Sequence, residues 1–284
     1  MLFDVAHASF VDGPGIRTTV FFKGCPLNCV WCHNPEGISR QPQLAYYSKK
    51  CIGCMECVEA CSFGAHRNEN GVHHFDRTLC QNCGVCVPRC FGEALTFFGR
   101  EVTVDELLSV LLEDKDFYDT SGGGVTLSGG ECLIQADFCA ELLKRLKEHG
   151  VHTAVDTCGF VPRQTLDQVM PYTDVFLYDV KAIDEDVHIR CTGQSNRIIL
   201  ENLRYLDEQG KTTQIRIPYV PGGNDDQMEK IRDFLSELKH VDEVRVLAYH
   251  SMGEAKYRAL GREPMSFTPP NADRIAWLNS LFAL

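Results

Sequence analysis

Cysteine placement is the feature that most restricts how this chain can fold. Eleven of its fifteen cysteines fall within residues 25–90, in groups whose spacing suits metal ligands. The first group, Cys25, Cys29 and Cys32, follows an apolar run that predicts a strand. Three thiolates can hold three irons of a cubane cluster and leave the fourth iron open for a ligand, much as a catalytic zinc keeps one open position. A zinc site that adds His33, or three buried thiols, are the alternatives.

An internal repeat of cysteines comes next. Residues 51–61 and 80–90, 29 residues apart, both have the spacing C-x2-C-x2-C-x3-C. This doubled spacing resembles bacterial two-cluster ferredoxin, in which the fourth cysteine of each run ligates the other run's cluster. The usual proline after the fourth cysteine is absent, but it shapes the turn and is not a ligand. A pair of four-cysteine zinc knuckles is the alternative.

The ferredoxin resemblance implies which cysteines share a cluster. One [4Fe-4S] cluster would be held by Cys51, Cys54, Cys57 and Cys90. The other would be held by Cys80, Cys83, Cys86 and Cys61.

Composition limits the class of protein. The 284 residues are enough for one large domain and a small insert, and 44% hydrophobic with 24% charged residues is ordinary for a globular protein. The net charge of −11 argues against a nucleic-acid surface. We expect neither a signal peptide nor a membrane span, because no basic segment precedes an apolar core and no apolar run is long enough. Thiols spaced as ligands then predict a reducing compartment, the cytoplasm.

The pattern after residue 98 is that of an α/β protein. Thr103 and Glu106 form a capping box that begins a helix, and residues 125–128 predict a short buried strand. Strand and helix candidates then alternate, which indicates βαβ units and a parallel sheet. The expected helices span residues 135–149, 163–170, 196–209 and 226–239, and the expected strands span 151–156, 174–180, 212–219 and 243–248. A partial barrel and a doubly wound sheet both fit this pattern.

Several short motifs together resemble the radical S-adenosylmethionine (SAM) superfamily, and within it the glycyl-radical-enzyme activating enzymes. Besides the first cysteine group, the matching segments are 12–17 (DGPGIR), 31–36 (WCHNPE), 121–126 (SGGGVT), 128–131 (SGGE), 156–159 (DTCG), 179–181 (DVK) and 249–250 (YH). The resemblance implies a partial (β/α)6 barrel formed by residues 1–46 and 100–284. Residues 47–99 would be a ferredoxin-like insert with two [4Fe-4S] clusters. Each motif follows a predicted strand, as expected for sites at the carboxyl ends of parallel strands.

The resemblance also implies an activity. In the family, the cluster held by Cys25, Cys29 and Cys32 binds the methionine moiety of SAM at its open iron. One electron cleaves SAM to methionine and a 5′-deoxyadenosyl radical, which abstracts a hydrogen atom from a glycine in the C-terminal loop of a partner glycyl radical enzyme. The chain is therefore expected to be an oxidoreductase with three [4Fe-4S] clusters and SAM as cofactors.

Further site residues follow from the same resemblance. Gly129, Gly130 and Glu131 would receive the methionine amino group. Asp179 would accept hydrogen bonds from the ribose. The SAM carboxylate would contact Lys181, His250 and Arg216.

Other residues have weaker expectations. Asp156 and Thr157 match residues that bind a monovalent cation beside SAM, and hard oxygen ligands suit that role. The turn at Asp12 would face the partner's glycine loop. Four cysteines outside the ligand groups are expected to be small buried hydrophobic residues: Cys132, Cys139, Cys158 and Cys191.

The expected partners are a glycyl radical enzyme and, as electron donor, flavodoxin or ferredoxin. The two insert clusters would carry electrons from that donor to the active site, since ferredoxin-type clusters have potentials near about −400 mV. One rival is a radical SAM enzyme that acts on a small molecule or peptide. The other is a pure electron carrier, which would leave most of the chain without a purpose.

Overall fold

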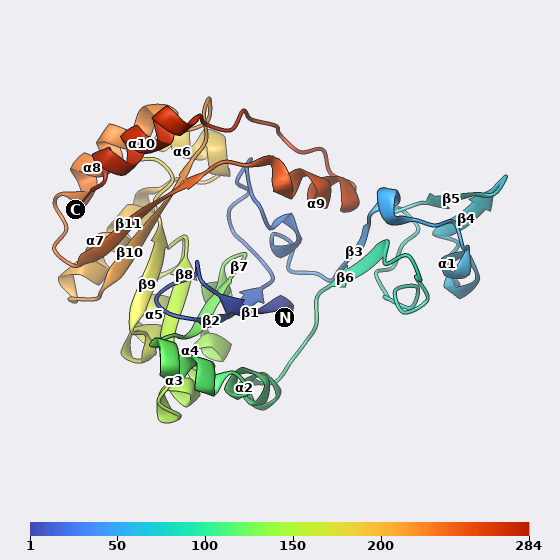
Figure 1. The fold of residues 1–284 in the computed structure, drawn as a ribbon, viewed down its shortest axis with the longest axis horizontal. Coiled ribbons are helices and arrows are strands. Elements are labelled where there is room, and N and C mark those ends of the chain that lie inside the picture. The colour runs from blue at the N-terminus through green and yellow to red at the C-terminus, as the bar shows by residue number, and fades with distance from the viewer. Residues whose placement is uncertain (284) are drawn as a thin grey trace.

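The structure, a computed structural model, describes residues 1–283. Its main body is a seven-stranded sheet with the order β1-β2-β7-β8-β9-β10-β11 (Figure 1). The strands are β1 (Leu2–Ser9), β2 (Arg17–Phe22), β7 (Gly124–Gly129), β8 (His152–Thr157), β9 (Val175–Asp179), β10 (Thr213–Tyr219) and β11 (Val241–Ala248). From β2 to β11 every neighbouring pair is parallel, and only β1 is antiparallel. Six parallel strands in sequence order agree with the expected partial barrel.

Helices before the last strand connect the parallel strands and cover the outer face of the sheet (Figure 1). They are α2 (Val104–Leu112), α3 (Lys115–Ser121), α4 (Ala136–Glu148), α5 (Arg163–Val169), α6 (Glu185–Thr192), α7 (Arg197–Glu208) and α8 (Met228–Leu235). Two more helices, α9 (Glu254–Ala259) and α10 (Ala272–Leu281), follow β11. The capping box predicted at Thr103 and Glu106 begins α2. Gly150 follows α4 with a φ of 70°, as expected for a glycine beyond a helix end.

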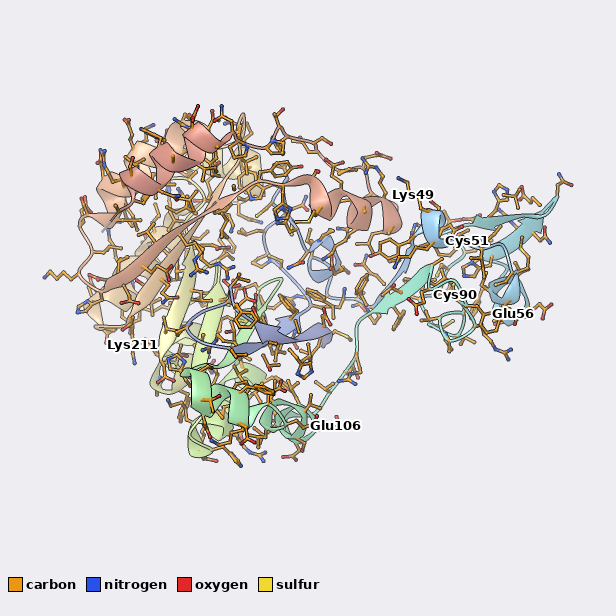
Figure 2. All side chains as sticks on the ribbon, in the orientation of Figure 1. Lys49, Cys51, Glu56, Cys90, Glu106 and Lys211 are labelled. Atoms are coloured by element: carbon orange, nitrogen blue, oxygen red, sulfur yellow. The ribbon has the colours of Figure 1, made fainter. Side chains whose placement is uncertain are left out.

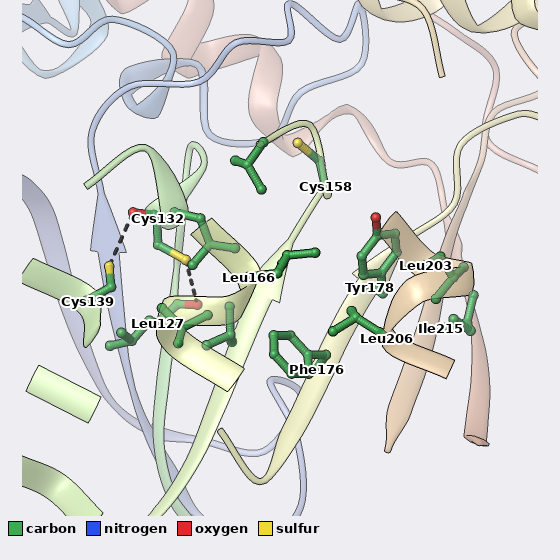
Figure 3. Close-up of a cluster of buried hydrophobic side chains, with 14 of the residues drawn as sticks. Leu127, Cys132, Cys139, Cys158, Leu166, Phe176, Tyr178, Leu203, Leu206 and Ile215 are labelled. Carbon is green, nitrogen blue, oxygen red and sulfur yellow. Dashed lines mark hydrogen bonds between the residues drawn. The ribbon is translucent and has the colours of Figure 1, made fainter. Parts of the chain in front are cut away.

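The core lies between the sheet and these helices (Figure 3). Phe176, Tyr178 and Ile215 from the strands pack against helix residues such as Leu166 and Leu203, and all are fully buried. Such apolar burial contributes roughly 25 cal/mol per Å² of area removed from water. The buried face fixes the strand register, so the polar residues at the strand ends gather at one edge.

Two cysteines of the core have specific partners. The Cys139 thiol donates to the Cys132 carbonyl at 3.2 Å, and the Cys132 thiol to the Leu127 carbonyl at 3.5 Å (Figure 3). Cys191 is buried in a separate small cluster with Trp31 and Val220. The prediction that these three cysteines are buried is confirmed.

A smaller unit projects from the barrel between β2 and α2 (Figure 1). It contains β3 (Gln43–Tyr46), α1 (Glu56–Ala60), β4 (His66–Glu69), β5 (Val72–Phe75) and β6 (Leu95–Phe98). β3 pairs with β6 and β4 pairs with β5, both antiparallel. Its small core combines Leu44 and Leu95 with Cys57 and Cys86. We call residues 43–98 the insert; the predicted domain boundaries at 46/47 and 99/100 stay a prediction.

Short 3-10 turns complete the chain. They are η1 (Pro35–Gly37), η2 (Ser48–Lys50), η3 (Cys132–Gln135), η4 (Met170–Tyr172), η5 (Asp225–Gln227) and η6 (Ser251–Gly253). In residues 1–283, none of the helices combines the length and apolar character needed to cross a membrane.

Candidate active site

A cavity of about 240 Å³ opens at the carboxyl edge of the parallel strands. The three thiols of the first cysteine group line it together with residues on, or just after, five different strands. The residues on strands are Gly129 (β7), Asp156 and Thr157 (β8), Asp179 (β9) and Arg216 (β10). Those just after a strand are Gly130 (β7), Lys181 (β9) and Tyr249 (β11). Motifs far apart in the sequence thus meet at one site, as parallel strand ends predict.

The three thiols of the first group lie on the loop that leaves β2. The loop is held in place by Glu36, which is 2% exposed and pairs with Lys256 of α9 at 2.5 Å. Burial raises the pKa of the Cys29 thiol, and it raises that of Cys32 to about 12. A metal cluster takes cysteine as thiolate, so loading this site would displace protons.

His33 lines the same cavity as the three thiols, and its ring is engaged by His250. Its Nε2 lies 3.1 Å from the His250 carbonyl oxygen, and its ring stacks on the His250 ring at 3.9 Å. This arrangement disfavours the alternative of a zinc site that includes His33.

Gly129 and Gly130 let two strand ends approach closely. A Cβ at Gly129, where φ is 122°, would lie 2.2 Å from the Phe22 nitrogen. A Cβ at Gly130 would lie 2.3 Å from the Gly24 carbonyl oxygen. Packing between β2 and β7 therefore requires both glycines, whether or not a ligand approaches them.

Glu131 lies behind the cavity wall and is fully buried. Its carboxylate accepts hydrogen bonds from the Leu133 and Cys158 backbone N–H groups, at 3.1 and 2.8 Å, and from the Thr157 hydroxyl, at 2.9 Å. Burial raises the pKa of this carboxyl, and these donors oppose the shift. The Glu131 side chain thus positions the loop after β8. The predicted contact with the methionine amino group concerns the Glu131 backbone carbonyl, and it stays a prediction.

Lys181 is a buried cation at the cavity. Its Nζ lies 2.6 Å from Asp179 Oδ2. Burial alone would lower the pKa of Lys181, but Asp179 raises it above its ordinary value, so the amine is charged.

Arg216 joins two carboxylates across the cavity floor. Its Nη1 lies 3.1 Å from Asp156 Oδ2, and its Nη2 lies 3.5 Å from Asp12 Oδ1. Burial raises the pKa of Asp156 to about 6, against the opposing effect of Arg216. The Arg216 Nε group is buried and has no hydrogen-bond partner within the described chain, so it is available to an anionic ligand.

Two predicted residues lie less directly at the cavity. His250 stacks behind His33 and does not line the cavity wall, which Tyr249 lines instead. The Thr157 hydroxyl donates to Glu131. The predicted roles of His250 and Thr157 stay predictions.

Cys158 is the residue that the sequence argument underestimated. It is buried as expected, and it also lines the cavity together with Cys25. Its proximity lowers the pKa of Cys25. Its position directly after two site residues at a strand end was the available signal.

The insert cysteines gather in two further cavities. One is lined by Cys51, Cys54, Cys57 and Cys90. The other is lined by Cys61, Cys80, Cys83 and Cys86. These are the crossed sets that the ferredoxin resemblance implies, and Figure 2 shows Cys51 near Cys90 in the insert. Among residues 1–283 all fifteen cysteines are free thiols.

Comparison with known proteins gives the class. Residues 19–235 match the family model "Radical SAM superfamily". A structure of SuiB from Streptococcus suis bound to precursor peptide SuiA shares the fold, with a TM-score of 0.58 at 15% identity over 92% of this chain and 44% of that one. The chain belongs to the radical SAM superfamily.

Curated relatives narrow the class. The choline trimethylamine-lyase activating enzyme of Oleidesulfovibrio alaskensis is 41% identical over 96% of this chain and 91% of its own. The trans-4-hydroxy-L-proline dehydratase activating enzyme of Clostridioides difficile is 39% identical over 99% and 95%. The indoleacetate decarboxylase activating enzyme of Tractidigestivibacter scatoligenes is 42% identical over 92% and 86%. Within the superfamily, this chain is therefore a glycyl-radical-enzyme activating enzyme, an oxidoreductase.

Proposed function

We propose that this chain activates its partner enzyme with SAM bound in the cavity at the carboxyl edge of the sheet. The observation that carries the proposal is the meeting of three thiols with a buried, charged lysine in that one cavity. Cys25, Cys29 and Cys32 would hold a [4Fe-4S] cluster. When bound, such a cluster offers an open iron to SAM and the electron that cleaves SAM to methionine and a 5′-deoxyadenosyl radical. The radical then takes a hydrogen atom from a glycine of the partner.

Lys181 and Asp179 would orient SAM. An ammonium group has three donors, and Asp179 takes one of those of Lys181, which leaves donors for the SAM carboxylate. Asp179 retains acceptor capacity for the ribose hydroxyls. Backbone groups at Gly129 and Gly130 would face the methionine amino group, since both glycines line the same cavity.

Arg216 and His250 would assist on the carboxylate side. Arg216 offers an unpartnered Nε–H group, while the pairing of Nη1 with Asp156 and of Nη2 with Asp12 fixes the guanidinium in place. Asp156 and Thr157 would hold a monovalent cation beside SAM. The cation is the least supported part of the proposal, because Arg216 already neutralises Asp156 and Glu131 accepts from Thr157.

The insert would carry two further [4Fe-4S] clusters, which brings the total to three. Support comes from the two cavities, each lined by four cysteines in the combination implied by ferredoxin. We further propose that these clusters form a wire from flavodoxin or ferredoxin to the active site, in the reducing cytoplasm.

The wire can be tested separately from SAM binding. A variant with Cys54→Ala and Cys83→Ala should be reduced more slowly by the external donor and still bind SAM. Cys191→Ala, a buried cysteine outside both insert cavities, is the control. Equal reduction rates in the double variant and the control would rule the wire out.

The partner's identity is open among several classes. The relatives named above activate a lyase, a dehydratase and a decarboxylase, and their identities to this chain differ by only a few per cent. A panel of glycyl radical enzymes would identify the partner. Release of 5′-deoxyadenosine from SAM by the reduced, iron-loaded protein tests the proposed chemistry. Absence of cleavage with iron bound and reducible would refute it.

A further inference from the structure

A pair of histidines lies between the two cysteine-lined cavities of the insert. His73 lines the cavity of Cys51 and Cys90, and His66 lines the cavity of Cys61. Their rings stack at 5.1 Å between centroids, and His66 Nδ1 lies 2.9 Å from His73 Nε2. The pair thus spans the wall that separates the two sites.

The histidine pair continues to a tyrosine. His73 Nδ1 lies 2.9 Å from the Tyr46 hydroxyl and 3.9 Å from the Cys51 sulfur. Tyr46 and Cys51 line the same cavity. Tyr46 ends β3 and His73 belongs to β5, so two separate strand pairs bring these groups to one cysteine.

The direction of the hydrogen bonds from His66 to Cys51 follows from what Cys51 can accept. A cluster-bound thiolate only accepts hydrogen bonds, so the groups next to Cys51 must donate toward it. Each neutral imidazole has one donor and one acceptor nitrogen. His66 Nδ1–H therefore donates to His73 Nε2, which leaves His73 Nδ1–H to face the Tyr46 hydroxyl oxygen and the Cys51 sulfur. With its oxygen accepting from His73, the Tyr46 O–H is free to donate to the sulfur.

The same residues do not form a separate metal site. The ligand atoms of Cys57, His66 and His73 lie within 4.8 Å of one another, as for a small metal ion. However, Cys57 also lines a cavity with three other thiols, so it is available as a ligand of an iron–sulfur cluster there. The two histidines then remain as hydrogen-bonding groups.

We propose that Tyr46 and His73, oriented by His66, tune the reduction potential of the cluster bound by Cys51, Cys54, Cys57 and Cys90. The inference rests on the proposed function, which supplies that cluster. On reduction one electron enters from the external donor, no bond breaks, and the sulfurs gain negative charge. Hydrogen bonds to sulfur stabilise the reduced form and raise the potential.

The test isolates the two insert clusters. In full-length protein carrying Cys25→Ala, Cys29→Ala and Cys32→Ala, about eight irons per chain should remain for two clusters. Fewer irons would refute the proposed insert clusters themselves, and one zinc in place of four irons would identify a metal site at the histidines.

The potentials are then measured by redox titration followed with electron paramagnetic resonance. Tyr46→Phe keeps the ring and removes the hydroxyl, and His73→Phe keeps a ring and removes both nitrogens. Each should shift one of the two reduction steps by about 59 mV to a more negative potential, which is a tenfold change in the one-electron equilibrium constant. The other reduction step should not shift. Tyr47→Phe and His74→Phe, one position along each segment, are the matched controls.

A second readout separates hydrogen bonding from a general structural change. Electron–nuclear double resonance of the reduced cluster in H2O and D2O should show an exchangeable proton that Tyr46→Phe removes. Unchanged potentials in both variants at full iron content would overturn the inference. Equal shifts in the control variants, or in both reduction steps, would overturn it as well.

Discussion

The positive charge of Lys181 is central to the proposed binding of the SAM carboxylate. It is 7% exposed and pairs with Asp179 at the cavity. Lys181→Met should weaken SAM binding roughly 10- to 100-fold, since a hydrogen bond to a charged group is worth about 1.5–3 kcal/mol. Equilibrium dialysis with labelled SAM under anaerobic conditions measures the loss.

Lys211→Met is the matched control for that experiment. Lys211 lies just before β10, at the opposite end of the sheet from the cavity, and donates to the Met170 carbonyl oxygen at 3.0 Å (Figure 2). Its replacement should leave SAM affinity unchanged. Equal affinities in the two variants would remove Lys181 from the binding site.

Cys158 presents a fourth thiol beside the three proposed ligands. Because Cys158 lines the cavity but lies outside the C-x3-C-x2-C group, we expect it to adjoin the cluster and not to bind iron. Cys158→Ala should keep the full iron content and SAM-dependent cleavage, whereas Cys29→Ala should lose about four irons. Loss of iron in Cys158→Ala would make Cys158 a ligand and close the open iron position.

At the scale of elements, α9 is the contact between the cluster loop and the insert. Lys256 of α9 pairs with Glu36, and the Ala259 carbonyl at its end accepts a hydrogen bond from Arg77 of the insert. Arg77 also donates to the Leu44 carbonyl at 2.8 Å. One guanidinium therefore ties β3 to α9.

Removal of Arg77 should loosen this contact. Arg77→Ala should speed hydrogen exchange in β3 and α9. The iron content should not change, because Arg77 does not line either of the cysteine-lined cavities. Arg67→Ala, an exposed arginine on β4, is the control. Unchanged exchange would show that other contacts hold the insert in place.

The sequence predicted the elements that carry regular patterns and missed those that do not. The parallel strands from β7 onward and helices α4, α5, α7 and α8 lie where alternation placed them, within a few residues at the ends. β1 was not predicted: it pairs with only one strand and is mostly half-buried or exposed, so it lacks a buried run. The hairpin of β4 and β5 is polar and short, and only tertiary contacts reveal it.

The candidate site was predictable to a similar degree. The family resemblance supplied Asp156, Asp179 and Lys181, and they lie together because parallel topology brings the carboxyl ends of strands to one edge. Side-chain direction was beyond that argument: the Glu131 carboxylate points into the core, and His250 stacks behind His33. Direction depends on packing from elements distant in the sequence, which spacing does not encode.

At the scale of the molecule, the barrel and the insert have different proposed roles, SAM binding and electron transfer. The barrel edge gathers the groups that we propose bind SAM, and the insert holds two sets of four cysteines in a unit that projects from the barrel (Figure 1). Projection leaves Cys54 and Cys83 exposed, which suits electron entry from another protein.

The most direct test is anaerobic incubation of the reduced, iron-loaded protein with SAM and each candidate glycyl radical enzyme, followed by electron paramagnetic resonance. We predict a glycine-centred doublet with one partner and methionine released in proportion. Deoxyadenosine without a doublet across the panel would contradict activation and favour a small-molecule or peptide substrate.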